Sequence, residues 1–340
     1  YDWCRRWRLK VNTTKSNIVD LRQCRVNRSE FDFKYVNLDL WIVKEYKYLG
    51  VILDDHLKFE TCSKTLADSG GRALSAIISK FKAFKDMGYG TFTKMFQACV
   101  VPVLDYGSGV WGKVKANHAE IIQNKAYRYF LGVHNFTPVA AMQAEMGWLP
   151  SKYRQWLKML LLWNRMVKMT DTRLTKQIFN QDYLSEKNNW TSSVKGILEQ
   201  LEIEDVYDRK IECDIDICNK KMFALFENDC MEIINVKPKL RTFKMFKNDC
   251  IVPEYVKYGL NRYERSRLAK SRCGILQLRI ETGRFVNLKV DDRICELCET
   301  GGIEDEFHFL CQCNLYNSYR DTLFVDIGKE YPDFNALDLK

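Results

Sequence analysis

The stretch FETCSKTLADSGGRALSAIISKFKAFKDMG, residues 59–88, decides the fold class of this chain. Its apolar residues recur every three or four positions, the spacing of one buried face of a helix. That face is predicted to carry Leu66, Ala73, Leu74, Ile77, Ile78, Phe81 and Phe84. Similar patterns, separated by Pro and Gly, predict helices at 92–104, 118–131 and 153–169. The body of the protein is therefore predicted to be helical.

Upstream of that helix the pattern is typical of short strands. Residues 1–26 predict the end of a helix, a polar connection at residues 12–17, and a strand that contains Ile18 and Val19. The segments FKYVNLDLWIV (33–43) and YKYLGVILDD (46–55) are rich in β-branched and aromatic residues and predict a strand pair. We therefore predict an α+β fold that is predominantly α.

Charge is distributed unevenly along the chain, whose formal net charge is +9. Residues 237–289 hold fourteen Lys or Arg against four Asp or Glu, whereas residues 291–340 hold four against twelve. A basic stretch of this kind is suited to binding phosphate, although a solvated helix face is the alternative. Within it, RYERSRLAKSRCGILQLRIETGR (262–284) predicts one long basic helix that ends at Gly283. Its inward residues are predicted to be Leu268, Ile275, Leu276 and Ile280.

The segment CELCETGGIEDEFHFLCQC, residues 295–313, has the spacing of a zinc site. The pair Cys295 and Cys298 lies on one turn, and His308 with a later cysteine can complete a Cys3His tetrahedron. A redox role would require a neighbouring βαβ pattern, which the sequence lacks; buried cysteines without a metal are the alternative. On an unbroken helix Cys311 would share a face with His308, whereas a break near Gln312 would let Cys313 swing back. The spacing alone leaves this choice open.

Four protein ligands close the shell of a zinc ion, which is typical of a structural rather than a catalytic site. The neighbouring acids Glu304, Asp305 and Glu306 are then explained by the dipole at a helix start. The cofactor predicted from the residues is therefore structural zinc.

The thirteen cysteines are spread over 340 residues with no signal-peptide pattern, so we expect reduced thiols in an intracellular protein, cytoplasmic or nuclear. The most apolar window, Trp156 to Trp163, is too short to span a bilayer. No membrane partner is therefore expected.

Several stretches, in chain order, resemble the end of the reverse transcriptase of LINE-type non-LTR retrotransposons. WCRRWRLKVNTTKS (3–16) resembles the segment after the polymerase active site, and YKYLGVILDDHLKF (46–59) resembles the hairpin that follows. The segments that resemble the helical thumb are VVPVLDYGSGVW (100–111), IIQNKAYRYFLGV (121–133) and AEMGWLP (144–150). Those that resemble the cysteine-rich C-terminal part are IETGRF (280–285), CELC (295–298) and EDEFHFLCQCNLYNSYR (304–320).

The quoted segments cover most of the chain except about residues 171–255. With that segment taken as a connector, the resemblance implies four parts. They are a palm edge with β-hairpins at 1–60, a thumb-like domain at 61–170, a variable helical connector at 171–255, and a basic helix with a zinc knuckle at 256–340. It also favours Cys313, in an H-x4-C arrangement, over Cys311 as the fourth ligand. The implied ligands are Cys295, Cys298, His308 and Cys313.

The resemblance further implies that the catalytic aspartates, in a Y-A-D-D motif, lie before Tyr1, so that magnesium belongs only to the parent polymerase. Asp54 and Asp55 follow the hairpin and are better explained as a turn; Asp291 and Asp292 are no stronger candidates. Asn12 would shape the turn before Lys15, which matches a lysine near the incoming nucleotide. Leu49 and Gly50 resemble the tip of the hairpin that grips the primer.

The predicted function is binding of nucleic acid, with no catalytic residue and no small-molecule substrate. The expected partners are RNA and DNA, chiefly the element's own RNA. The candidate contacts are Lys15, Arg262, Arg265, Arg267, Lys270, Arg272 and Arg279, with Tyr255, Tyr258 and Tyr263 as candidate stacking rings. The alternatives are a zinc-stabilised module that binds an acidic protein, and an intact metal-dependent enzyme that uses Asp54 and Asp55.

Overall fold

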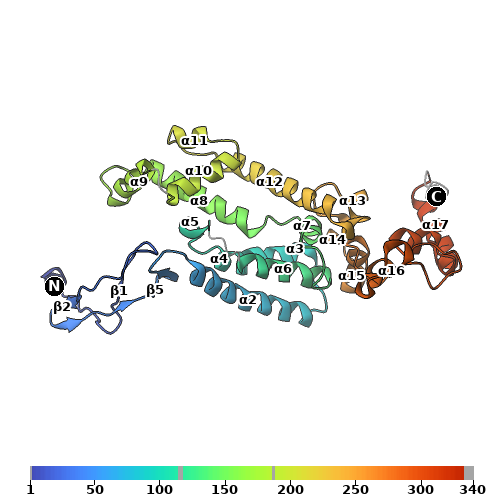
Figure 1. Cartoon of the computed structure of the whole chain (residues 1–340), viewed down its shortest axis with the longest axis horizontal. Coiled ribbons are helices and arrows are strands. Elements are labelled where there is room, and N and C mark those ends of the chain that lie inside the picture. Colours follow the sequence, from blue (N-terminus) through green and yellow to red (C-terminus); the bar gives the residue numbers. More distant parts are fainter. Residues whose placement is uncertain (1, 114–117, 186–187, 333–340) are drawn as a thin grey trace. The chain divides into compact units, whose positions relative to one another are not determined.

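Helices make up most of the chain, and its few strands are short and confined to the N-terminal part (Figure 1). The computed structural model describes residues 2–113, 118–185 and 188–332. The predicted α+β fold, mainly α, is therefore confirmed. The described residues form two compact units, residues 2–85, 91–113, 118–123, 149–185 and 188–224 in the first and residues 86–90, 124–148 and 225–332 in the second. The four-part division of the chain stays a prediction.

The strands of the first unit form three two-stranded sheets: β1 with β4 (parallel), and β2 with β3 and β5 with β6 (antiparallel). They are β1 (Ile18–Val19), β2 (Lys34–Tyr35), β3 (Leu38–Asp39), β4 (Ile42–Val43), β5 (Glu45–Tyr48) and β6 (Val51–Asp54). The predicted pair of 33–43 with 46–55 is therefore wrong. Residues 33–43 turn back at Val36, whose φ is +59°, and 46–55 closes on itself.

The β5–β6 hairpin turns at Leu49 and Gly50, which have φ of 47° and 90°. Two positive φ values in a two-residue loop match the twist of the flanking strands. The Tyr106 hydroxyl donates to the Leu49 carbonyl at 2.8 Å, and a Cβ on Gly50 would lie 3.1 Å from the Tyr106 ring. Tyr106 therefore ties two of the motifs recognised in the sequence together at the hairpin tip.

The helices of the first unit surround an aromatic and aliphatic core. They are α1 (Asp2–Arg6), α2 (Glu60–Ala83), α3 (Tyr89–Cys99), α4 (Val101–Leu104), α5 (Ser108–Trp111), α8 (Ser151–Lys168), α9 (Leu174–Leu184), α10 (Trp190–Gln200) and α11 (Asp205–Asp208). Leu74, Ile77 and Phe81 of α2 are buried as predicted, and the Phe81 and Phe92 rings meet edge to face at 5.9 Å. Phe84 is 72% exposed because α2 ends at Ala83. Residues 2–58 contain no buried residue.

Three of the described helices have residues in both units: α3, α6 (His118–Leu131) and α12 (Ile215–Val236). The prediction for 118–131 matches α6, and that for 153–169 matches α8 within two residues. The helix predicted at 92–104 is broken between α3 and α4. Pro102 lacks the N–H that would continue the helical ladder, which explains the break.

The second unit is built from short helices and turns. They are α7 (Val139–Met146), η1 (Pro238–Leu240), α13 (Phe243–Phe246), α14 (Glu254–Lys257), α15 (Arg262–Arg272), α16 (Arg279–Thr282), η2 (Gly283–Val286), η3 (Val290–Asp292), η4 (His308–Gln312), η5 (Asn314–Tyr316) and α17 (Asn317–Glu330). Its fully buried side chains include Tyr127, Phe130, Phe226 and Phe243. In the part of the chain that the structure describes, no helix is both long and apolar enough to cross a membrane.

The single basic helix predicted over 262–284 is wrong, because the structure has α15 and α16 with a turn between them (Figure 1). Gly274 lies just past α15 with φ +63°, a conformation that ends helices and favours glycine. A Cβ there would lie 2.4 Å from the Lys239 carbonyl oxygen. Leu268, predicted to face inward, is 43% exposed, whereas Ile280 is buried.

Candidate metal centre

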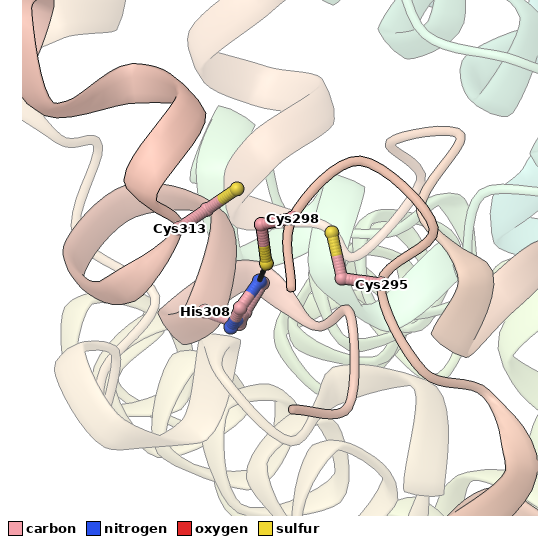
Figure 2. A group of neighbouring side chains, drawn as sticks. All are labelled: Cys295, Cys298, His308 and Cys313. Carbon is pink, nitrogen blue, oxygen red and sulfur yellow. Dashed lines mark hydrogen bonds between the residues drawn. The ribbon is translucent and has the colours of Figure 1, made fainter. Parts of the chain in front are cut away.

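Three cysteines and one histidine of the second unit converge on one point. The candidate ligand atoms of Cys295, Cys298, His308 and Cys313 all lie within 4.8 Å of one another. In Figure 2 the sulfurs of Cys295 and Cys298 come from one loop, and Cys313 and His308 come from the helical segment that faces it. The Cys298 sulfur lies 3.3 Å from His308 Nε2. This group could hold a metal ion.

A short β-bridge shapes the first half of the cluster. Ile294 and Ile303 pair in antiparallel fashion, and the Cys295 N–H donates to the Gly302 carbonyl at 2.9 Å. The backbone N–H groups of Leu297 and Cys298 hydrogen-bond to the Cys295 sulfur. A thiolate that accepts main-chain hydrogen bonds is stabilised for metal binding, because the sulfur must lose its proton to become a ligand.

A π-helical turn, η4, shapes the second half. The Cys313 N–H donates to the carbonyl of His308, five residues earlier, at 2.8 Å, and Cys313 then leaves the helix in an extended conformation. On an α-helix residues five apart point about 140° away from each other, whereas the wider turn brings them to one side. The break near Gln312, one of the two alternatives that the spacing left open, is therefore present. After the break, Asn314 begins the short helix η5, and α17 begins at Asn317.

Cys311 lies outside the cluster. It is half-buried, and burial raises the pKa of its thiol. Cys313 instead is buried, and its carbonyl accepts a hydrogen bond from Arg320 Nη2 at 2.8 Å, which joins α17 to the turn. The geometry thus groups Cys313, rather than Cys311, with the other three candidate ligands.

The chemistry of the donor set fits zinc. Tetrahedral Zn²⁺ with three Zn–S bonds of about 2.3 Å separates its sulfurs by about 3.8 Å, so a set within 4.8 Å needs a contraction of about 1 Å at most. The Thr300 hydroxyl and backbone N–H, which hydrogen-bond to the sulfur, lower the pKa of Cys298 to about 6. Burial raises the pKa of Cys295 to about 11. Four such donors leave no open position for substrate.

The three acids beside His308 have separate roles, so the helix dipole is only part of their explanation. Asp305 caps the turn by accepting the His308 N–H at 2.8 Å. The buried Glu304 accepts the Arg279 N–H at 2.8 Å, at the start of α16. Glu306, 1% exposed, accepts both Arg241 Nη2, at 2.8 and 2.9 Å, and the Thr242 hydroxyl at 3.0 Å. Glu304 and Glu306, which precede the candidate ligand His308, thus bond this segment to residues distant in sequence.

The basic residues predicted to contact nucleic acid fall into two groups. Arg265 is 2% exposed and pairs with Asp86 at 2.9 Å; Arg272 pairs with the fully buried Glu145 at 2.9 Å. Both guanidinium groups are held in ion pairs with carboxylates, although the Arg272 side chain stays 24% exposed. The remaining residues of the set lie at least partly at the surface; they are Lys15, Arg262, Arg267, Lys270 and Arg279.

The tyrosines divide in the same way. The Tyr255 hydroxyl bonds to Glu145, and burial together with that carboxylate raises its pKa strongly. Tyr258 and Tyr263 are 67% and 63% exposed. Asp86, Glu145 and Arg241 are partners that no pattern in the sequence predicts. Glu145 lies in the quoted segment AEMGWLP, but no spacing signal joins it to Arg272, 127 residues away.

Asp54 and Asp55 of the first unit both have partners within that unit. Asp54 accepts the backbone N–H groups of His56, Lys58 and Phe59 at 3.1, 3.0 and 2.7 Å. Asp55 pairs with Arg22 at 2.9 Å; burial opposes ionisation, but the Arg22 hydrogen bond helps to lower the pKa of Asp55 overall. This arrangement favours the turn interpretation. Asp291 and Asp292 lie exposed in η3.

Comparison with known proteins gives one informative relative. Over 131 residues, 37% of this chain, the sequence is 28% identical to a probable RNA-directed DNA polymerase from transposon BS of Drosophila melanogaster. That match spans 14% of the relative's length. The similarity supports a relation to transposon reverse transcriptases. No family model matches the chain, and no solved structure matches it.

Proposed function

We propose that this chain is the C-terminal, nucleic-acid-binding part of a non-LTR retrotransposon reverse transcriptase, the part that follows the catalytic aspartates. The observation that carries the proposal is the 131-residue similarity to a transposon RNA-directed DNA polymerase. The motifs from 3–16 to 304–320 support it, because they occur in the order of that family. On this proposal residues 1–60 are a palm edge, 61–170 a thumb-like domain, 171–255 a connector and 256–340 a basic module with a zinc knuckle.

The zinc knuckle is proposed to be structural. Cys295, Cys298, His308 and Cys313 would hold Zn²⁺, which supplies binding energy for folding and no chemistry of its own. Through Glu304 and Glu306, the same segment bonds to the start of α16 and to Arg241. Magnesium would be a cofactor only of the whole polymerase.

The proposed nucleic-acid contacts are the surface members of the predicted set, Lys15, Arg262, Arg267, Lys270 and Arg279. Of these, Arg279 also pairs with Glu296 at 2.6 Å, and that surface pair would open to release it to a phosphate. Arg265 and Arg272 would act indirectly, by holding α15 in place. The partners would be RNA and DNA inside the cell, in cytoplasm or nucleus, without a membrane.

Salt dependence tests this proposal. Contacts to phosphate release counterions, so affinity for an RNA hairpin is expected to fall by about 10-fold or more between 50 and 200 mM salt if a few phosphates are contacted. Fluorescence anisotropy of a labelled hairpin measures the affinity. An affinity that stays constant over this range would count against phosphate binding.

The same purified chain tests the absence of catalysis. Primer extension on a poly(rA) template is expected to give no product with magnesium, and Asp55→Asn is expected to change nothing. Extension that requires Asp55 would favour the intact enzyme. The other alternative, a module for an acidic protein, rests on the same basic surface. It would be favoured if single-stranded RNA failed to displace a bound acidic polypeptide.

A further inference from the structure

We infer that Tyr263 and Arg267 of α15 form a stacking platform for one unpaired nucleotide. The inference rests on the proposed function and names its ligand more narrowly, as unpaired rather than duplex nucleic acid. It also assigns the two residues different tasks: the ring takes the face of a base, and the guanidinium takes a phosphate.

The platform begins at a well-defined helix start. Asn261 Oδ1 accepts the N–H groups of Tyr263 and Glu264 at 2.9 and 3.1 Å, and Glu264 Oε2 accepts the Asn261 N–H at 3.0 Å. This capping box occupies the first donors of the helix, so that side chains rather than backbone groups must meet a ligand there. It also fixes the turn from which Tyr263 projects.

Tyr263 and Arg267 are four residues apart and therefore lie on one face of α15. The Arg267 guanidinium carbon is 4.4 Å from the centre of the Tyr263 ring. The ring is nevertheless 63% exposed, and Arg267 is exposed as well. The stack thus restricts the orientation of the ring without covering it, and most of an aromatic surface stays open to solvent. A base stacked on such a ring would gain apolar burial.

Charge at this face suits a phosphate chain. Arg262 and Lys270 are both partly exposed, and Arg262 stacks on Tyr129 at 4.6 Å. The acid within this stretch of α15 is Glu264, whose carboxylate is already bonded to the capping N–H. The net charge of this face is therefore positive. An arginine held flat against a ring can still present N–H donors at its edge.

Stacking on Tyr263 requires a base whose face is free. In a duplex both faces of each internal base are covered by neighbours, whereas a single strand can turn a base outward. Because every base has a stacking face, the platform would discriminate little among sequences. Oligouridylate and oligothymidylate share this chemistry, so both are used as probes.

The test compares binding of labelled single strands of about 15 nucleotides, as RNA and as DNA, with binding of a blunt RNA duplex of the same length. Tyr263→Ala is expected to weaken single-strand binding by about 5-fold to 150-fold, and Tyr263→Phe by no more than about twofold. The duplex affinity should change little in either variant. Tyr319→Ala is the matched control, because Tyr319 is a 76% exposed tyrosine on α17.

The possible outcomes distinguish failure of the stacking platform from failure of the proposed nucleic-acid binding. If the unaltered chain binds single strands and Tyr263→Ala binds them equally well, the platform is refuted while nucleic-acid binding stands. Equal losses for duplex and single strand would also refute stacking. If the unaltered chain binds none of the probes, both the inference and the proposed function fail. A loss with RNA alone would identify RNA as the source of the nucleotide.

Discussion

Arg265→Ala is expected to destabilise the protein rather than to remove a contact with nucleic acid. Arg265 donates to the Phe130 carbonyl at 3.0 Å and to the Leu260 carbonyl at 3.2 Å, and it pairs with Asp86 at 2.9 Å. Its guanidinium carbon also lies 4.2 Å from the centre of the Phe130 ring. All of these interactions would be lost at once.

The loss of stability follows from the groups that would remain without their partner. Removing one member of a buried ion pair typically costs about 3–5 kcal/mol, because the other charge stays buried. The Asp86 side chain is 28% exposed and can be rehydrated, which favours the lower end. The two carbonyls left without this donor cost about 1 kcal/mol each. A total of about 5 kcal/mol would lower Tm by about 10 to 20 °C for a cooperative unit of this size.

Thermal melting followed by circular dichroism measures the effect, with RNA affinity measured below the melting range. Arg267→Ala is the matched control, because it changes an exposed arginine of the same helix. The control should keep its Tm, with at most about 0.5 kcal/mol lost, but bind RNA more weakly. An Arg265→Ala protein with unchanged Tm and reduced RNA affinity would refute the assignment of Arg265 to the interior.

Three further predictions concern the metal segment. Cys313→Ser should lose bound zinc by elemental mass spectrometry while Cys311→Ser keeps it; equal zinc in both would exclude Cys313 as the fourth ligand. Gly302→Ala would put a Cβ 3.1 Å from the His308 imidazole, and the affinity for zinc, measured by competition with a chelator, should fall about 10-fold. An unchanged affinity would mean that the ring moves freely. Glu306→Gln removes a carboxylate that is 1% exposed and should lower the free energy of unfolding in urea by about 2–3 kcal/mol; no loss would show that its ion pair is solvated.

The helices that could be predicted are those whose apolar period is uninterrupted. Residues 118–131 and 153–169 show a 3.6-residue period bounded by Gly or Pro, and both helices lie at or near the predicted positions. The basic segment 262–284 has the same period, but Gly274 turns the chain because its backbone packs against the Lys239 carbonyl. A contact between segments so far apart leaves no trace in local spacing.

The candidate site could likewise be predicted only where the signal is local in the sequence. The pair Cys295 and Cys298 is recognisable because two thiols on one tight turn have a characteristic spacing. The orientation of α15 is not recognisable: the sequence predicts Arg265 as a contact to nucleic acid, but its burial depends on Asp86, 179 residues away. Burial of an arginine is decided by such a partner, since an unpaired guanidinium would stay in water.

The π turn from His308 to Gln312 has a consequence for insertions and deletions. An α-helix places residues four apart on one face, so removing one residue between His308 and Cys313 would let an ordinary helical turn present the same two ligands. The extra residue is thus accommodated by widening a single turn, with no change to the loop that carries Cys295 and Cys298. H-x3-C and H-x4-C spacings are in this sense interchangeable solutions, and the ligand geometry, rather than the residue count, is what selection would preserve.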